Sequence, residues 1–90
     1  MIQANYQITY PHGLHARPAT MLVGAANDYK SKIILEYRDV RVTAKSIMGV
    51  LSLGIPAHAL FKLTFEGEDE EQAFKTLDKV IFDINKLPSQ

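Results

Sequence analysis

An α+β domain is predicted, in which a four-stranded antiparallel sheet is covered on one face by three helices. Some segments alternate apolar and polar residues, as half-buried strands do, and others repeat apolar residues every three or four positions, as amphipathic helices do. The segments follow one another in the order β-α-β-β-α-β-α. Strands with a single apolar face are typical of an antiparallel sheet, so the architecture expected is an open-faced, two-layer sandwich.

The N-terminal half predicts a strand, a helix and a hairpin. Residues 2–10 alternate strictly, and the Pro-His-Gly run at 11–13 interrupts them. The helical spacing then covers about residues 16–27, with Pro18 in the first turn, where a missing N–H costs nothing. Two strand-like runs, 32–37 and 40–44, are separated by only Arg38 and Asp39, which indicates a hairpin.

The C-terminal half predicts a short helix, a strand and a long helix. Ser46 can N-cap a helix over 47–53, which Gly54 ends, and residues 59–66 form the last strand. Asp69 and Gln72 have the spacing of a capping box at the start of the final helix. Its apolar stripe consists of Ala73, Phe74, Leu77, Val80, Ile81 and Ile84.

Length and composition limit the class of protein. Ninety residues, 47% of them hydrophobic and 22% charged, suit a single globular domain over residues 1–90. Ten basic and ten acidic residues give a net charge of zero, which disfavours direct nucleic-acid binding. The lack of cysteine excludes disulfides and thiolate metal sites. With no signal-like start and no apolar run of membrane-spanning length, we expect a cytoplasmic protein without membrane insertion.

One segment carries more chemistry than the fold requires. His15 lies where a glycine loop meets a helix start, and there unpaired N–H groups and the positive helix end stabilise an anion and favour the neutral, nucleophilic imidazole. Arg17 adds a planar donor suited to phosphate oxygens, so the pair is typical of a phosphate acceptor. Two alternatives stay open: an ordinary surface histidine and arginine, or a metal site formed by His12, His15 and possibly His58.

The short helix over 47–53 has too many apolar residues for one buried stripe. We expect Met48 and Leu51 to face outward, as in a surface that meets partners, although full burial is the competing explanation. Residues of the first helix that lie off its core face would complete the patch. The expected docking surface consists of Thr20, Met21, Gly24, Ile47, Met48 and Leu51.

Two motifs together resemble a known family. Residues 13–19 read Gly-Leu-His-Ala-Arg-Pro-Ala, and residues 45–54 read Lys-Ser-Ile-Met-Gly-Val-Leu-Ser-Leu-Gly. Both are similar to the HPr family, the histidine phosphocarriers of the bacterial phosphotransferase system. The resemblance implies that His15 accepts a phosphoryl group from phospho-Enzyme I through Nδ1, that Arg17 steadies it, and that IIA domains of sugar permeases receive it. It implies a relay carrier with no turnover of its own, no cofactor and no metal, for which a monomer is suitable.

The resemblance also assigns a regulatory role to Ser46. In Gram-positive members a dedicated HPr kinase/phosphorylase modifies the equivalent serine. A phosphate there adds roughly 1.5 to 2 negative charges at a positive helix end and on the docking face. The alternative function is a regulatory module similar to the HPr-like co-repressors, which bind a LacI-type catabolite repressor through phospho-Ser46. Such relatives typically lack the active histidine, whereas this sequence has His15.

Four positions depart from the family pattern. His12 stands where a small polar residue is more usual, and Arg38-Asp39 replaces a glycine-containing turn. The Pro-Ala-His run at 56–58 replaces a more flexible connection, and Phe82 falls off the apolar stripe and is expected to be exposed.

Overall fold

The structure, a computed structural model, describes residues 1–88 and contains the seven predicted elements in the predicted order. The strands are β1 (Ile2–Gln7), β2 (Lys32–Tyr37), β3 (Val40–Thr43) and β4 (Leu60–Glu66). The helices are α1 (Ala16–Ala26), α2 (Ile47–Ser52) and α3 (Glu70–Ile84). Most bounds agree with the sequence within one residue, so the predicted α+β fold is confirmed.

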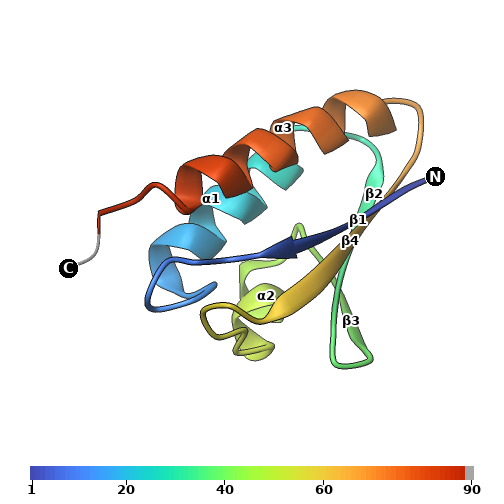
Figure 1. The fold of residues 1–90 in the computed structure, drawn as a ribbon. Coiled ribbons are helices and arrows are strands. Elements are labelled where there is room, and N and C mark those ends of the chain that lie inside the picture. Colours follow the sequence, from blue (N-terminus) through green and yellow to red (C-terminus); the bar gives the residue numbers. More distant parts are fainter. Residues whose placement is uncertain (89–90) are drawn as a thin grey trace.

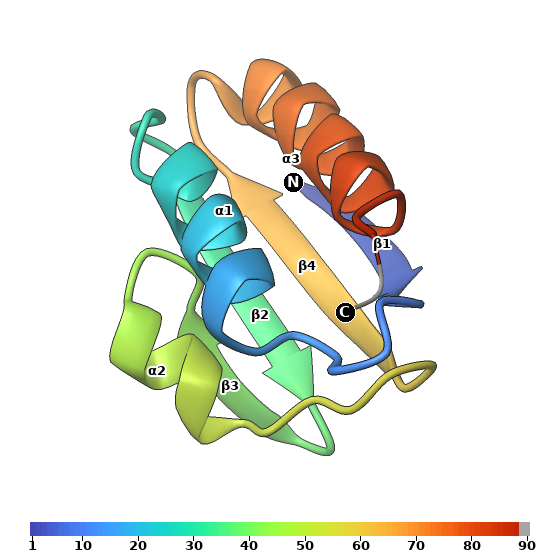
Figure 2. The ribbon, with the colours of Figure 1, turned by 90° about the vertical axis from the view of Figure 1, so that its left-hand side faces the viewer.

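The four strands form one antiparallel sheet in the order β1-β4-β2-β3. All three helices cover the same face, and α1 lies between α2 and α3 (Figures 1 and 2). The other face of the sheet is left open, which makes the molecule the open-faced sandwich expected from the one-sided strands. Within residues 1–88, no helix combines the length and the apolar character needed to cross a membrane.

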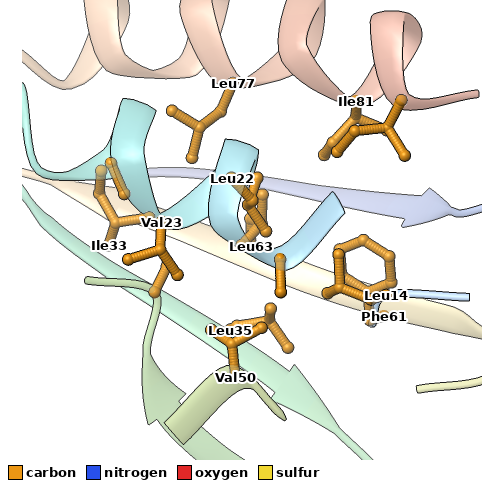
Figure 3. Packing of buried hydrophobic residues seen from close by; sticks show 14 of the residues in the cluster. Leu14, Leu22, Val23, Ile33, Leu35, Val50, Phe61, Leu63, Leu77 and Ile81 are labelled. Carbon is orange, nitrogen blue, oxygen red and sulfur yellow. The ribbon is translucent and has the colours of Figure 1, made fainter. Parts of the chain in front are cut away.

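The core lies between the sheet and the helices and is built from the alternating and helical apolar positions (Figure 3). Phe61, Leu63 and Phe65 of β4 are buried, as are the residues of the α3 stripe that face the sheet. Phe82, on the opposite side of α3, is 57% exposed, as its position off the stripe predicts. Outside β4 and α3, the large apolar side chains that are fully buried are Ile8, Leu14, Leu22, Ile33, Leu35 and Val50.

The first strand ends earlier than the sequence predicts. Alternation continues to residue 10, but β1 ends at Gln7. The partner strand explains the difference, because β4 begins at Leu60, which pairs with Gln7, and His58 just before it has a left-handed φ of 72°. His58 N–H still donates to the Ile8 carbonyl at 2.7 Å, but no strand residue lies opposite residues 8–10. On the free edge of β1, Asn85 Nδ2 donates to the Gln7 carbonyl at 3.0 Å and its Oδ1 accepts from Thr9 N–H at 2.8 Å, which ties the segment after β1 to the end of α3.

The predicted capping box at α3 is wrong. Asp69 is the N-cap residue, but its side chain makes no capping bond. Its carboxylate instead accepts the N–H groups of Lys30 and Ser31, each at 2.9 Å, and the Ser31 hydroxyl. These bonds, the one from the Ser31 hydroxyl first, lower the pKa of Asp69 below its usual value. Asp69 thus ties the loop before β2 to the start of α3.

The β2–β3 hairpin is confirmed, and its turn is strained. Arg38 and Asp39 have φ values of 50° and 65°, the left-handed geometry that two-residue hairpin turns require. Glycine, asparagine or aspartate usually occupies such positions, so Asp39 suits its place, whereas a residue such as Arg38 costs roughly 1–2 kcal/mol there. The departure from a glycine-containing turn therefore carries a cost in stability.

Candidate functional site

His15 occupies the N-cap position of α1 with an extended backbone, φ −108° and ψ −168°. Its carbonyl accepts the N–H of Ala19 at 2.8 Å, which begins the helix, but its imidazole makes no capping hydrogen bond. The residue is exposed. The ring is therefore available to react, while its backbone is fixed by the helix.

The loop before His15 is held by close backbone packing. Gly13 has φ +71°, and a Cβ at this position would lie 2.4 Å from the carbonyl oxygen of Ile55. Leu14 N–H donates to that same oxygen at 3.0 Å, and the Leu14 side chain is buried in the cluster of Figure 3. Only glycine fits at this close backbone contact between Gly13 and Ile55, which we call the Gly13 crossing. The crossing and the buried Leu14 side chain together hold the loop that presents His15.

The first turn of α1 is suited to an anion. The N–H groups of Ala16 and Arg17 have no partner within the helix, and Pro18 has no N–H. There is no acidic residue in this turn, and Arg17 is exposed. Two N–H donors, a guanidinium and the positive helix end thus favour negative charge beside His15.

The structure brings the predicted pair together in one hollow of about 150 Å³. The sequence did not predict Tyr10 as part of it, because the residue continues the apolar face of the first strand. Its position five residues before His15 was the available signal. The hollow is lined by Tyr10, His12, His15, Ala16, Arg17 and Pro18.

Ser46 lies at the other end of α1 from His15. Its Oγ accepts Gly49 N–H at 3.1 Å, so the predicted N-cap is confirmed. The side chain of Asn27, just after α1, donates to the carbonyl of Lys45 at 3.1 Å and so holds the residue before Ser46 against the helix end. Eleven residues of helix span roughly 16 Å, so the two candidate sites are separate.

The expected docking residues are exposed to different degrees. Met48 is 74% exposed, and Thr20 and Gly24 are also exposed, as predicted. Met21 and Leu51 are half-buried and pack against the core, so the expectation that they lie free of it is only partly correct; Ile47 packs in the same way. The reason is that α2 sits against α1, and each helix covers part of the other's apolar surface (Figure 2).

The metal alternative finds no support in the geometry. His12 and His15 share the hollow, but His58 does not line it. Over the described stretch 1–88, no three histidine or carboxylate side chains are grouped closely enough to hold a metal ion.

Comparisons with known proteins agree with one another. Residues 2–83 match the family model described as the PTS HPr component phosphorylation site. The structure is similar to HPr-C-His from Thermoanaerobacter tengcongensis, with a TM-score of 0.92 and 40% identity over 98% of this chain and 99% of that one. It is also similar to the phosphocarrier protein HPr from Bacillus anthracis, with a TM-score of 0.82 and 38% identity over 88% and 94%. The Bacillus subtilis catabolite repression protein Crh, in a domain-swapped dimer, has a TM-score of 0.72 and 36% identity over 92% and 95%.

Proposed function

Because this chain belongs to the HPr family of phosphotransferase-system phosphocarriers, we propose that His15 is its phosphoryl acceptor. Phospho-Enzyme I would donate the group, and IIA domains of sugar permeases would receive it. His15 is exposed at the start of α1, which supports a role as an acceptor that two partners must reach in turn. The chain itself then acts as a substrate of its partners and has no turnover of its own.

The proposed transfer is a displacement at phosphorus. The lone pair of neutral His15 Nδ1 forms the new N–P bond, while the bond from phosphorus to the donor group on Enzyme I breaks and its electron pair leaves with that group. The negative charge on the transferred group meets the Arg17 guanidinium and the N–H groups at the helix start. Transfer to a IIA domain repeats the step with the roles reversed, so the carrier must hold the phosphoryl group without burying it.

The observation that carries this proposal is the shared hollow of His15 and Arg17 at the first turn of α1. A nucleophile without an anion site, or an anion site without a nucleophile, would not suit a carrier. Here the glycine crossing at Gly13 fixes the loop, and the exposed ring is free of any capping bond. These features support a preorganised acceptor.

Labelling with phosphoenolpyruvate and Enzyme I tests the assignment. We expect acid-labile label on the parent protein, none on His15→Ala, and at least tenfold slower labelling of Arg17→Ala at limiting Enzyme I. His58→Ala is the matched control, because this histidine lies outside the hollow and should label normally. Undiminished label on His15→Ala would overturn the acceptor assignment.

The proposed docking surface joins the two ends of α1. Thr20 and Gly24 lie along the helix, and Met48 of α2 projects beside it, so partners that reach His15 would contact this surface as well. Exposed methionine suits a surface that accepts several partners, since its side chain adapts its shape. The half-buried residues Met21, Ile47 and Leu51 would contribute their exposed edges.

A second role is favoured by Ser46. It is a half-exposed serine at the edge of the docking surface, and the similarity to Crh supports regulation through it. An HPr kinase/phosphorylase would phosphorylate Ser46, and a LacI-type catabolite repressor would bind the product. The added charge would lie at the other end of α1 from His15, and an eleven-residue helix spans roughly 16 Å, about twice the Debye length of about 8 Å, so it would act on docking rather than on the imidazole.

Ser46→Asp tests this regulatory role. The KM of Enzyme I for the variant should rise at least several-fold, whereas the hydrolysis rate of phospho-His15 should stay within about twofold of the parent. Ser52→Asp, at an exposed position at the other end of α2, is the control for added charge. If Ser46→Asp changed neither the KM nor repressor binding, the regulatory proposal would be rejected.

We also propose that the carrier works as a cytoplasmic monomer, because both partners must reach the same face in turn. The Crh structure is a domain-swapped dimer, so the alternative to a monomer is a dimer of this kind. Sedimentation of the chain at increasing concentration distinguishes the two: a constant mass near 10.1 kDa supports the monomer, and a stable species of twice that mass overturns it.

A further inference from the structure

A second histidine lines the hollow that His15 and Arg17 share. His12 lines the same space as His15 and Arg17, and so does the ring of Tyr10. Thus two histidines, one guanidinium and one phenol border the place where a phosphoryl group on His15 would project. We propose that His12 contacts that phosphoryl group and that its protonation state sets how tightly the carrier holds it. This inference rests on the phosphorylation of His15 proposed above.

The position of His12 is fixed by its own turn. Gly13 N–H donates to the Tyr10 carbonyl at 2.8 Å, which closes a four-residue turn with Pro11 and His12 at its centre. The Tyr10 ring meets the His12 ring edge-on, with centroids 5.7 Å apart and planes at 66°. Since Gly13 also packs closely against Ile55, the backbone of the turn that carries His12 is held beside the hollow.

The charges around His12 favour a link between its proton and the phosphoryl group. In the unphosphorylated protein the cationic group that lines the hollow is Arg17. Tyr10 and His15 are the other titratable groups there. The segment packed against Gly13, residues 55–57, contributes only Ile, Pro and Ala, and the next titratable side chain along it is His58. A phosphoryl group on His15 would therefore be the dominant negative charge facing His12.

Two consequences follow by reciprocity. Phosphorylation favours the imidazolium form of His12, and protonated His12 in turn favours the phosphorylated carrier by the same factor. A side chain exposed to water is screened, so we expect the lower end of the range for close opposite charges, a shift of about one pH unit. That shift corresponds to about tenfold tighter retention of the phosphoryl group under mildly acidic conditions.

NMR titration of the three histidines, before and after phosphorylation by Enzyme I, measures the first consequence. The midpoint of His12 should rise by about one pH unit on phosphorylation, and that of His58 should stay within about 0.2 units. A merely structural role of His12 in the turn would not produce this shift. A phosphorylated protein in which His12 titrates as before would overturn the inference while leaving the acceptor role of His15 intact. A protein that Enzyme I does not phosphorylate on His15 would overturn both.

A competition experiment measures the second consequence. Isotopically labelled parent and unlabelled His12→Asn share a limited phosphoryl pool through catalytic Enzyme I, and intact mass gives the ratio of the two phosphorylated forms. Because both carriers exchange with the same enzyme, the pH dependence of Enzyme I cancels in the ratio.

We expect the parent to hold several-fold to tenfold more of the phosphoryl pool than His12→Asn at pH 6 and a nearly equal share at pH 8. His58→Asn, whose side chain tolerates the left-handed φ of 72°, is the matched control and should share equally at both pH values. A ratio for His12→Asn that is the same at pH 6 and pH 8 contradicts the proposal.

Discussion

Replacing Gly13 with alanine should destabilise the fold far more than the same change at Gly24 or Gly54. At φ +71°, an alanine pays roughly 1–2 kcal/mol for the left-handed conformation. Its Cβ would also lie 2.4 Å from the Ile55 oxygen and 2.8 Å from the Pro56 carbonyl carbon, which are backbone atoms that cannot rotate away. Forcing such a shift costs about 1–3 kcal/mol and weakens the bond from Leu14 N–H to Ile55.

The expected net loss for Gly13→Ala is about 3 kcal/mol, after allowing for the smaller chain entropy of an unfolded alanine. Two other glycines separate the contributions. Gly54→Ala has φ +57° but no atom within 4 Å of the new Cβ, so it should cost only about 1 kcal/mol. Gly24→Ala lies within α1 with open space around it and should stabilise by about 0.5–1 kcal/mol.

Urea denaturation of the three variants and the parent, with free energies of unfolding taken at a common m-value, decides the matter. The order Gly24→Ala, parent, Gly54→Ala, Gly13→Ala, from most to least stable, is required. If Gly13→Ala lost no more stability than Gly54→Ala, the tight crossing beneath the His15 loop would be refuted. Slower labelling of Gly13→Ala by Enzyme I, under conditions where it is folded, would connect the crossing to the placement of the imidazole.

Three further changes test other parts of the molecule. Asp69→Asn should lower the urea midpoint of unfolding, and the midpoint of the variant should fall less steeply in acid than that of the parent. The folded-state pKa of Asp69 is lowered, so the stabilisation by its carboxylate is present above the unfolded pKa of about 3.9 and is lost as the pH falls further. Urea denaturation at a series of pH values from 5 to 2 measures this difference. Met48→Ser should change the free energy of unfolding by no more than about 0.5 kcal/mol but raise the KM of Enzyme I at least severalfold; an unchanged KM would remove Met48 from the docking surface. Tyr6→Phe removes a hydroxyl that donates to Asp78 at 3.0 Å and should cost about 1 kcal/mol at neutral pH. Burial and this bond raise the pKa of Tyr6, so its contribution is present below pH ~10 and lost above it, and alkaline denaturation of the variant should be less steep.

Features that depend on residues close in the sequence were predicted correctly. Alternation and helical spacing located all seven elements, and the cap at Ser46 was confirmed because a serine and the N–H of Gly49 are only three residues apart. The failures concern contacts between distant residues. The Asp69 carboxylate is taken by Ser31, 38 positions away, so capping-box spacing was a poor guide. Likewise, β1 ends at Gln7 because its distant partner β4 begins at Leu60, which the alternation of residues 2–10 does not indicate.

The candidate site divides in the same way. His15 and Arg17 were predictable because a helix start and its charges are set by adjacent residues. The contribution of Tyr10 was not, because the residue continues the strand pattern while the chain has already left the sheet.

The separation of the two candidate phosphorylation sites limits how they can communicate. A charge on Ser46 is separated from His15 by the length of α1, roughly 16 Å, and is screened in physiological salt. What the sites share is the surface between them, formed by α1 and α2. A partner large enough to cover that surface contacts both ends of α1 at once, so a charge at one end changes the affinity of a partner that reacts at the other. Regulation of this carrier should therefore appear in binding constants for its protein partners and leave the chemistry of phospho-His15 with water unchanged.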